Sequence, residues 1–414
     1  MKKIIALQTA ALLMIVAAAT AQVLDSWGTI DTWQYTAKAS AVACSASANS
    51  TGTLFVGGRA GNDARDSAKQ LGVVKVYQPS EIAGETGGRV LFASPGNVGS
   101  VAAGTSGDVY FTGEFPDASG AYRWTVLHCT AGGTATRYVQ TDGAGGGDIA
   151  LYDGKVYVVG SCLPNYDRAL RVFAVGETPS SLTLLTDVRL FTPDGRKMYT
   201  RGIVVNADGI FVAGAVPDRA DYRFSNWLIA RSTDHGVNWE IIDTEDVPSY
   251  GANALTLDDQ GTIYAGGRGP GYTWQVRMYP RIAEGIYGRE DLETYLLQPA
   301  LDAAAVGIGI CGGELYVAGW ARDYDPVAPT KKSPGGTHNT WITRKASVAN
   351  PYQWNGSDFY WPPSAYPGGT SWVNDLAVTA DRVFVVGYAT EFYPKAPRSP
   401  MQADRWVVRA FPAP

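Results

Sequence analysis

Among the residues of this sequence, the carboxylates could serve the widest range of catalytic reactions. A glycoside hydrolase needs two of them facing each other, about 5 Å apart in retaining enzymes and about 6.5–9.5 Å apart in inverting ones. Such a pair could be drawn from six acids, namely Glu114, Asp117, Asp167, Asp218, Asp323 and Asp325. Because these acids are spread along the chain, the sequence does not decide which of them face each other.

Other catalytic patterns have little support. No Gly-x-Ser-x-Gly segment occurs, and the three histidines are expected in a third strand (His128), a turn (His235) and a loop (His338). The spacing of Asp323 and Asp325 is too short a pattern for a metal-binding loop and lacks the glycine and glutamate that follow in one. The sequence therefore predicts no catalytic triad.

Metal and cysteine chemistry is also sparse. The cysteines contain no Cys-x-x-Cys pair, so no zinc site is predicted. No cofactor is expected, although the sequence leaves open a calcium ion in a central channel near Asp148 and Asp375. Free or buried thiols are favoured, but four cysteines allow three disulfide pairings, which stay open: Cys44, Cys129, Cys162 and Cys311.

A short sequence motif that occurs seven times, which we call the phrase, must position these residues. It consists of a β-branched or leucine residue, an aromatic residue, two small or apolar residues and a glycine. Its glycines are Gly58, Gly113, Gly160, Gly214, Gly267, Gly319 and Gly387. A repeat of about 55 residues indicates one structural unit built many times.

Each phrase belongs to a group of four short strands. An apolar strand and a Gly-, Asp- or Asn-containing turn precede it, which predicts a hairpin. A third strand that often begins with Trp follows, and then a less regular fourth strand. The first two strands are apolar on both faces, as expected of strands buried between stacked sheets. We therefore predict an all-β, single-domain, seven-bladed β-propeller of four-stranded blades.

The two ends of the chain suggest export and ring closure. Residues 1–21 combine a basic start, an apolar run and the Ala19-Thr20-Ala21 cleavage pattern, so they are predicted to be a signal peptide. Residues 22–414 would then form the propeller, secreted or periplasmic. The seventh unit lacks a fourth strand, and residues 32–36 near the N-terminus are predicted to supply it and so close the ring.

The charge of the chain narrows the range of partners. The formal net charge is −5, and charged residues make up 18% of the sequence. A mildly acidic surface disfavours nucleic acid and anionic membranes. No second stretch is long and apolar enough to span a membrane. We therefore expect no nucleic-acid partner, no membrane insertion and a monomer.

A family resemblance appears in the fourth unit. Ser232, Asp234, Gly236 and Trp239 have the S-x-D-x-G-x-x-W spacing. This segment resembles the Asp box of the sialidase-like, or BNR-repeat, propellers. The resemblance implies a structural turn in which the Asp caps amides, the Gly adopts an unusual backbone angle and the Trp packs beneath the hairpin.

The resemblance does not bring the chemistry of sialidases with it. That family carries an Arg-Ile-Pro segment near its start, three arginines that hold the substrate carboxylate, a Tyr–Glu nucleophile pair and an Asp acid/base. The nearest string here is Pro280-Arg281-Ile282-Ala283, which lies in the wrong unit, and no arginine precedes Arg59 in the first unit. Sialidase activity is therefore not expected.

Binding residues are expected at one face of the propeller. The loops between second and third strands are longest at residues 320–340 and 388–405, and long loops on a rigid scaffold often carry function. Further candidates follow the phrase glycine, or precede the first strand where side chains could reach the channel. The candidates are Arg59, Glu114, Arg201, Asn253, Arg268, Trp320, Asp323, Asp325, His338, Tyr388 and Glu391. The alternative for these residues is that they cap turns and bind water.

The sequence supports two functions from different classes. The first is an exported binding scaffold whose upper loops hold a glycan or a protein. The alternative is a carbohydrate-active enzyme with carboxylates at the channel mouth. A repeat protein of an outer-surface assembly is a third possibility, and it predicts a large exposed apolar patch.

Overall fold

The structure is a computed structural model. It describes the following residues: 28–33, 40–48, 52–61, 70–83, 88–104, 107–139, 143–176, 182–218, 225–244, 250–295, 302–324, 337–360, 370–393 and 401–412. The predicted signal peptide lies outside these ranges. No helix within them is long and apolar enough to cross a membrane.

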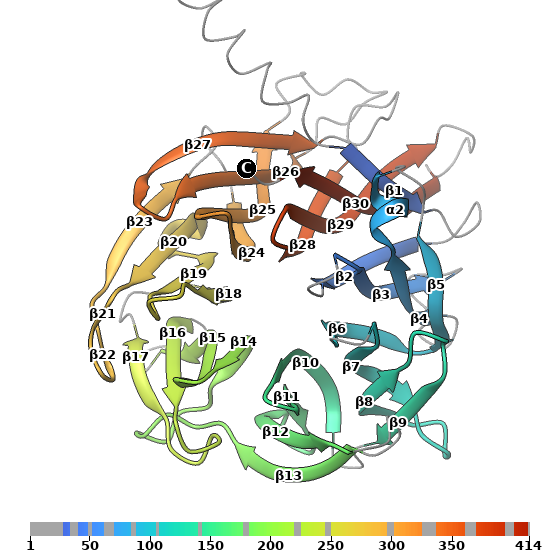
Figure 1. Ribbon diagram of the computed structural model, residues 1–414, viewed down its shortest axis with the longest axis horizontal. Helices are drawn as coiled ribbons and strands as arrows, with labels where there is room; N and C mark the ends of the chain where they lie inside the picture. Colours follow the sequence, from blue (N-terminus) through green and yellow to red (C-terminus); the bar gives the residue numbers. More distant parts are fainter. Residues whose placement is uncertain are drawn as a thin grey trace, which may run out of the picture.

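Seven four-stranded antiparallel sheets stand around a central axis, which confirms the predicted seven-bladed β-propeller (Figure 1). Blade one comprises β2 (Ser40–Ala48), β3 (Leu54–Gly61), β4 (Gln70–Tyr77) and β5 (Arg89–Pro95). Blade two comprises β6 (Asn97–Ala103), β7 (Val109–Pro116), β8 (Tyr122–Cys129) and β9 (Ala135–Val139). Blade three comprises β10 (Gly143–Tyr152), β11 (Lys155–Cys162), β12 (Asp167–Val175) and β13 (Leu182–Arg189).

The remaining blades follow the same order. Blade four comprises β14 (Tyr199–Asn206), β15 (Gly209–Pro217), β16 (Ser225–Ser232) and β17 (Glu240–Thr244). Blade five comprises β18 (Gly251–Leu257), β19 (Ile263–Arg268), β20 (Trp274–Tyr279) and β23 (Glu290–Tyr295). Blade six comprises β24 (Asp302–Cys311), β25 (Glu314–Tyr324), β26 (Thr337–Ser347) and β27 (Asn350–Tyr360). Blade seven comprises β28 (Thr370–Val378), β29 (Arg382–Tyr393), β30 (Met401–Pro412) and β1 (Gly28–Trp33).

Short elements occupy some connections. A five-residue helix, α2 (Pro79–Ala83), follows β4. A single 3-10 turn, η2 (Pro270–Tyr272), links β19 to β20, and the small hairpin of β21 (Arg281–Ala283) and β22 (Ile286–Tyr287) precedes β23.

The N-terminal strand closes the ring. β1 pairs antiparallel with β30, with Gly28 opposite Ala410 and Trp33 opposite Trp406. The prediction of closure is confirmed, but the pairing strand begins four residues earlier than residue 32, and residues 34–36 lie outside the described ranges. Because β30 would otherwise present an open edge, this pairing completes blade seven.

The aromatic residue of each phrase fills the wedge between its own blade and the next. The buried apolar residues form seven clusters, and each cluster joins two neighbouring blades. Tyr157 of blade three, for example, packs with Ile210 and Val212 of blade four. The core is therefore a ring of interfaces between blades, as apolar inner strands on both faces require.

The phrase glycine makes room for a tryptophan of the preceding blade. A Cβ atom at Gly160, Gly267 or Gly319 would lie 2.6–2.7 Å from the indole of Trp124, Trp227 or Trp274 respectively. These glycines lie inside paired strands, where the absence of a side chain allows the close packing of neighbouring blades.

Those indoles belong to a repeated contact. They lie in the third strand, opposite the residue that follows the phrase glycine, as Trp227 lies opposite Ala215. Five tryptophans occupy this position and are fully buried, namely Trp124, Trp227, Trp274, Trp341 and Trp406. An arginine of the next blade stacks on two of them, Arg171 on Trp124 at 4.9 Å and Arg277 on Trp227 at 4.4 Å.

The inner strand of every blade carries a β-bulge at the same height. At this height the pairing of the first with the second strand skips one residue of the first strand in six blades and two in blade three, where a separate irregularity also skips Ala144. The skipped residues are Cys44, Gly99, Gly147 with Asp148, Arg201, Asn253, Val306 and Asn374. We expected Arg201, Asn253 and Asn374 just before the first strand; they lie within it, at the bulge, which redirects a side chain.

Both ends of each long loop expected at residues 320–340 and 388–405 are strand. β25 pairs with β26 as far as Tyr324 and Thr337, and β29 pairs with β30 as far as Tyr393 and Met401. The connecting residues 325–336 and 394–400 lie outside the described ranges. The predicted boundaries were therefore wrong, because the hairpins continue beyond the repeated unit.

Three cysteines have described side chains. Cys129, Cys162 and Cys311 are buried free thiols. Burial raises the pKa of the Cys129 thiol to about 11, so this thiol is unreactive at neutral pH.

Candidate functional site

One end of the channel carries the candidate residues, and we name it the upper face. The connections from second to third strands, and from each fourth strand to the next blade, all reach this end because neighbouring strands are antiparallel. The first-to-second and third-to-fourth turns reach the opposite end.

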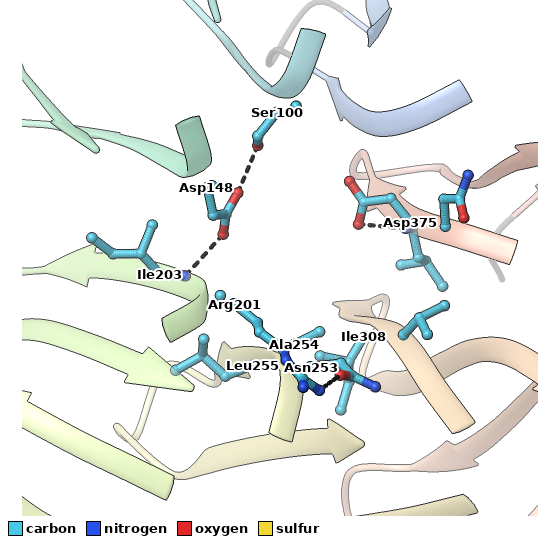
Figure 2. Close-up of a pocket in the computed structure, with 15 residues that line it drawn as sticks. Ser100, Asp148, Arg201, Ile203, Asn253, Ala254, Leu255, Ile308 and Asp375 are labelled. Atoms are coloured by element: carbon cyan, nitrogen blue, oxygen red, sulfur yellow. Dashed lines mark hydrogen bonds between the residues drawn. The ribbon is translucent and has the colours of Figure 1, made fainter. Parts of the chain in front are cut away.

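The bulges line a cavity in the channel. Its volume is about 210 Å³, and its wall is formed by inner-strand residues of blades two to seven. Figure 2 shows Asp148 and Arg201 on neighbouring strands, with Asp375 across the opening. Arg201, Asn253 and Asn374 are in the wall, so three residues predicted to reach the channel share this cavity.

Asp148 ties three blades together. One carboxylate oxygen accepts hydrogen bonds from Ser100 Oγ (2.6 Å) and from its neighbouring amide, Ile149 N (2.9 Å). The other accepts from Ile203 N at 2.9 Å (Figure 2). Burial raises the pKa of Asp148 even though these hydrogen bonds act in the opposite direction. Both oxygens therefore have a structural use.

Calcium gains no support from this geometry. Among the residues that the structure describes, no three or more His, Cys, Asp or Glu side chains are grouped to hold a metal ion. Asp375 accepts a hydrogen bond from Leu376 N at 2.8 Å on the other side of the channel. A channel calcium stays a prediction from the sequence.

Arg201 is the cation of the channel. Its Nη1 donates a 2.6 Å hydrogen bond to Asn253 Oδ1, and Asn253 Nδ2 donates to Ala305 O at 2.8 Å. Arg201 is accessible from the channel, but it lies inside the ring, where surrounding protein replaces bulk water. This desolvation lowers its pKa first, and the charges of Arg168 and Arg268 lower it further.

The residue that follows each phrase glycine forms the rim of the channel mouth. Each pairs with the inner strand of its own blade, as Glu114 pairs with Asn97 and Arg268 pairs with Gly251. The predicted candidates Arg59, Glu114, Arg268, Trp320 and Tyr388 all hold this position. Burial raises the pKa of Glu114.

Arg268 is held on three sides. Its guanidinium lies 4.0 Å from the ring centre of Tyr250 and 4.5 Å from that of Tyr272. Its Nη2 forms an ion pair with Asp302 at 2.6 Å. The two tyrosines are joined by a 2.9 Å hydrogen bond between their hydroxyls. Arg268 is thus fixed and already neutralised by a carboxylate.

Most of the strongly exposed aromatic side chains lie at the upper face. Of the seven aromatic side chains that are strongly exposed in the described part of the chain, five belong to upper-face connections of blades three to five. They are Tyr166 (63% exposed), Phe191 (37%), Tyr199 (37%), Tyr250 (38%) and Tyr272 (42%). We call these five residues the aromatic band. Tyr250 and Tyr272 flank Arg268, so two members of the band share a surface with that arginine.

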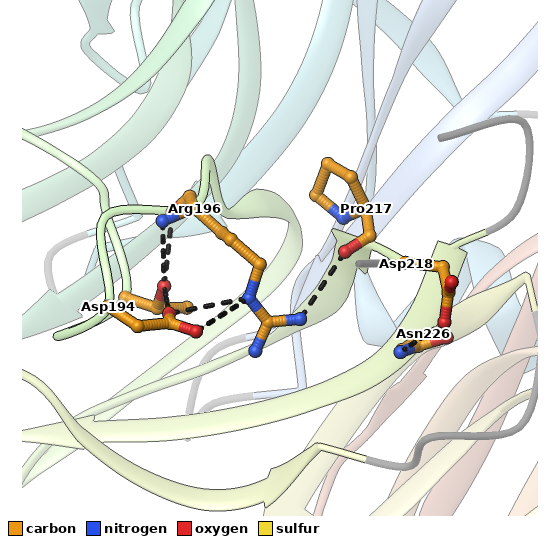
Figure 3. A network of polar contacts seen from close by, with 6 residues as sticks. Asp194, Arg196, Pro217, Asp218 and Asn226 are labelled. Carbon is orange, nitrogen blue, oxygen red and sulfur yellow. Dashed lines mark hydrogen bonds and ion pairs between the residues drawn. The ribbon is translucent and has the colours of Figure 1, made fainter. Parts of the chain in front are cut away.

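The wall beside Arg168 is rigid. Within the connection from blade three to blade four, Arg196 Nε donates to Asp194 Oδ2 at 3.0 Å and Arg196 Nη1 donates to Pro217 O at 3.3 Å (Figure 3). Leu190 N donates to Arg168 O at 2.8 Å. The connection is therefore fixed to both blades before any ligand arrives.

A second aromatic group lies between blades six and seven. Trp320 contacts Trp372 with ring centres 4.6 Å apart, and Trp372 stacks on Tyr388 at 6.3 Å. All three side chains are partly buried. Asp323 pairs with His338, and Glu391 with Ala403, in the strand ladders. These three candidates therefore lie on strands; nothing further is described of their side chains, and Asp325 lies outside the described residues.

Of the acids proposed for a catalytic pair, Glu114 and Asp117 belong to blade two, and Asp167, Asp218 and Asp323 belong to three other blades. Asp117 of blade two bonds to Ser119 and Arg123, which lower its pKa to about 2. Asp167 of blade three pairs with Lys197 at 2.6 Å, and Asp218 of blade four accepts from Asn226 Nδ2 at 3.2 Å (Figure 3). Asp117, Asp167 and Asp218 therefore each have a local partner.

The turn that resembles an Asp box has the expected hydrogen bonds. Asp234 Oδ1 accepts from Ser232 Oγ (2.8 Å) and Asn238 N (2.9 Å). Gly236 has a φ of 88°, and Trp239 is buried against the interface of blades three and four. His235 is a turn residue with a φ of 60°. These contacts account for the turn and lie on the face opposite the channel mouth.

Sequence reasoning missed Arg168 and the aromatic band. The signal for Arg168 was present, because Arg168-Ala-Leu-Arg171 follows the Trp-x-x-Arg pattern of other third strands with Arg in place of Trp. The band gave no such signal, since its members sit in connections of different length.

Comparison with known proteins adds little beyond the fold. No protein-family model and no curated protein matches this sequence. Sqt1 from Chaetomium thermophilum is similar with 13% identity and a TM-score of 0.45, over 91% of this chain and 97% of that one. A Bacteroides fragilis protein described as a 6-phosphogluconolactonase has 11% identity and a TM-score of 0.45, over 90% and 99%. The phage phi92 endosialidase has 10% identity and a TM-score of 0.48, over 94% and 69%. At such values a likeness says nothing about ligand or activity, and the fold rests on the strand pairing.

Proposed function

We propose that this chain is an exported binding propeller that holds a glycan on its upper face. The observation that carries the proposal is the aromatic band, because most strongly exposed aromatic rings of the described residues lie on one side of the channel mouth. Scattered exposed apolar residues are ordinary on a protein surface, but a gathered set on one face marks a contact surface.

The chemistry of the band favours sugars. A tyrosine offers an apolar ring face and a hydroxyl at its edge, so it can pack against the C–H face of a sugar and hydrogen-bond its hydroxyls. Arginines between the rings add donors for the ring and hydroxyl oxygens. The fixed connection around Arg196 lowers the entropy that such a surface would lose on binding.

An enzyme remains the second candidate because of Glu114. Burial raises the pKa of this rim carboxylate, which is a property of a general acid in glycoside hydrolysis. The nearby Asp117 is fully committed to Ser119 and Arg123, so a partner for Glu114 would have to come from another blade. Hydrolysis of a panel of aryl glycosides, lost in Glu114→Gln, would support the enzyme.

A glycan array probed with the folded chain tests the proposal. We expect Tyr199→Ala and Tyr272→Ala to weaken binding by about tenfold, since a stacked aromatic contact contributes on the order of 1 kcal/mol or more. Tyr152→Ala is the matched control, because Tyr152 is 37% exposed and lies in a turn on the opposite face. Absence of glycan binding, or equal loss in all three variants, would contradict the proposal.

A further inference from the structure

Glu114 is a rim carboxylate without a partner among the described residues. Other carboxylates of the upper face lie against cations, as Asp117 pairs with Arg123 at 3.2 Å and Asp302 with Arg268 at 2.6 Å. Within the described ranges, no hydrogen bond or ion pair holds Glu114, although its side chain is half-buried. The neutralisation that the other carboxylates receive is therefore missing at this position.

A glycine of the next blade leaves the space in which this carboxylate lies. A Cβ atom at Gly145 would be 2.5 Å from Glu114 Oε1, and the three heavy atoms nearest to it all belong to Glu114. Gly145 lies on the inner strand β10 of blade three, two residues before Gly147, which is part of the cavity wall. The side chain of Glu114 therefore reaches from blade two to blade three beside the entrance of the cavity.

The neighbours of Glu114 in its own sheet supply no proton donor. Asn97 lies directly opposite Glu114, so the two side chains share one face of blade two. Asn97 Oδ1 is enclosed and has no donor among the described residues, and its partial negative charge adds to that of the carboxylate. Trp124 lies opposite Glu114 on the other side, but its Nε1 donates to Thr112 Oγ1 at 2.8 Å.

This arrangement is unfavourable in the free protein. Burial raises the pKa of Glu114, and no nearby charge or hydrogen bond acts in the opposite direction. Arg59 holds the rim position of blade one but forms no ion pair with Glu114. A position that lowers stability without a structural return is a candidate for function.

We propose that Glu114, in the space left by Gly145, forms a cation subsite that binds the ammonium group of an amino sugar. This proposal rests on the proposed glycan-binding function and names the class of sugar, a hexosamine with a free amine. An ammonium group has three donors and no acceptor, so it suits a place where only acceptors lie. Its hydrogen bond to a carboxylate is charge-assisted and is therefore among the stronger ones.

The surroundings favour such a ligand in two further ways. The net charge of the chain is −5, which attracts cations rather than anions. Tyr166, the most exposed ring of the aromatic band, lies in the upper-face connection of blade three, the blade that contains Gly145. An amino sugar has both the cation for Glu114 and an apolar ring face for an aromatic side chain.

The first experiment compares a glucosamine oligomer with an N-acetylglucosamine oligomer of the same length by calorimetry, in mildly acidic buffer that keeps the amines protonated. We expect the wild type to bind the amine at least about tenfold more tightly, because a charged hydrogen bond is involved. Glu114→Gln should remove this preference. Asp153→Asn removes the same charge from an exposed turn on the opposite face, so it should keep the preference. Equal binding of both oligomers by the wild type overturns the cation subsite and leaves glycan binding standing.

The second experiment tests the place of the subsite through Gly145→Ala. The added Cβ atom would displace the Glu114 carboxylate, which is the end of a flexible side chain, so the fold should tolerate the change. We expect Gly145→Ala to lose most of the preference for the amine while its Tm stays close to that of the wild type. Gly132→Ala, in the turn after β8, is the matched control and should keep the preference. An unchanged preference in Gly145→Ala overturns the proposed site.

The third experiment uses small probes and needs no glycan polymer. Glucosamine hydrochloride, compared with sodium chloride at equal ionic strength, should raise the Tm of the wild type more than that of Glu114→Gln. An equal rise in both proteins overturns the subsite. A rise that depends on Glu114 without any glycan binding on an array supports the subsite and contradicts the wider function. A response to Nα-acetyl-lysinamide but not to glucosamine overturns the amino sugar and indicates a protein partner.

The fourth experiment separates binding from a structural or catalytic role. Glu114→Gln should leave the Tm of the free protein unchanged or higher, since no partner is lost. Asp243→Asn breaks a buried ion pair with Arg277 and should lower the Tm. If Glu114→Gln lowers the Tm as Asp243→Asn does, Glu114 is structural and the proposal fails. Hydrolysis of an aryl glycoside that is lost in Glu114→Gln also overturns it, because a general acid must carry a proton.

Discussion

Gly267→Ala is the smallest change that tests how the blades fit together. A Cβ atom at Gly267 would lie 2.7 Å from the indole of Trp227 and 2.8 Å from the Cα of Ala252, and it would overlap the carbonyl oxygen of Gly251. Real Cβ atoms do not approach so closely, and a methyl group has no rotamer that avoids the contact. One of the two blades must therefore move.

The cost follows from two opposing terms. Forcing one methyl group into a packed core costs typically about 1–3 kcal/mol. Replacing glycine also restricts the unfolded chain, which stabilises the protein by about 0.4–1 kcal/mol where the backbone allows it. We expect a net loss of about 1–2 kcal/mol in the free energy of unfolding, since steric overlap exceeds the entropic gain.

Chemical denaturation followed by tryptophan fluorescence measures this loss. The control is Gly132→Ala in the turn after β8, where the nearest atom, Thr130 Oγ1, is 3.7 Å from the added Cβ. It should leave stability unchanged or slightly higher. The alanine should also cost less in a Trp227→Leu background, because one of the overlaps is then relieved. If Gly267→Ala is as stable as Gly132→Ala, the packing explanation of the phrase glycine is wrong.

Two further predictions concern closure and pH. Deleting Gly28–Trp33 should sharply lower the Tm and promote association of the protein, because the edge of β30 is then uncovered. An unchanged melting curve together with a monomeric elution volume would refute the closing role of β1. Burial raises the pKa of Glu293 from 4.5 to about 7, more than its partner Arg344 lowers it. Between these two pH values the folded chain keeps a proton that the unfolded chain releases, so the free energy of unfolding should fall as pH rises from 4.5 to about 7. Unfolding curves measured over a pH series should show this slope in the wild type and a flatter slope in Glu293→Gln.

The fold was predictable because the repeat encodes it more than once. The aromatic phrase, the preceding apolar strand and the third-strand tryptophan recur in the same order and register. A strand that is hard to assign in one unit can therefore be assigned by comparison with the other units. The boundaries in blades six and seven were not predictable. There the hairpins run past the repeated unit into residues such as Tyr324 and Tyr393, which follow no pattern shared with other blades.

The positions of the rim residues and of the bulge residues in the first strands were partly predictable for the same reason. A position fixed relative to the phrase glycine, such as that of Glu114, has the same height in every blade. Arg201 and Asn253 were correctly expected to share one place. Sequence could not tell which charges are paired, because the partner of Arg268 is Asp302 of the next blade and their contact depends on how neighbouring sheets are placed.

The departures from the repeat are better candidates for function than the repeat itself. A seven-fold scaffold needs the same residue at each interface, and five buried tryptophans meet that need. Blade three gives up this packing at Arg168, and the adjacent bulge of blade four holds the cation Arg201 where other blades have Gly99, Val306 or Asn374. The departure at Arg168 replaces a fully buried indole with a partly buried guanidinium group, so the packing of the blades alone does not explain it.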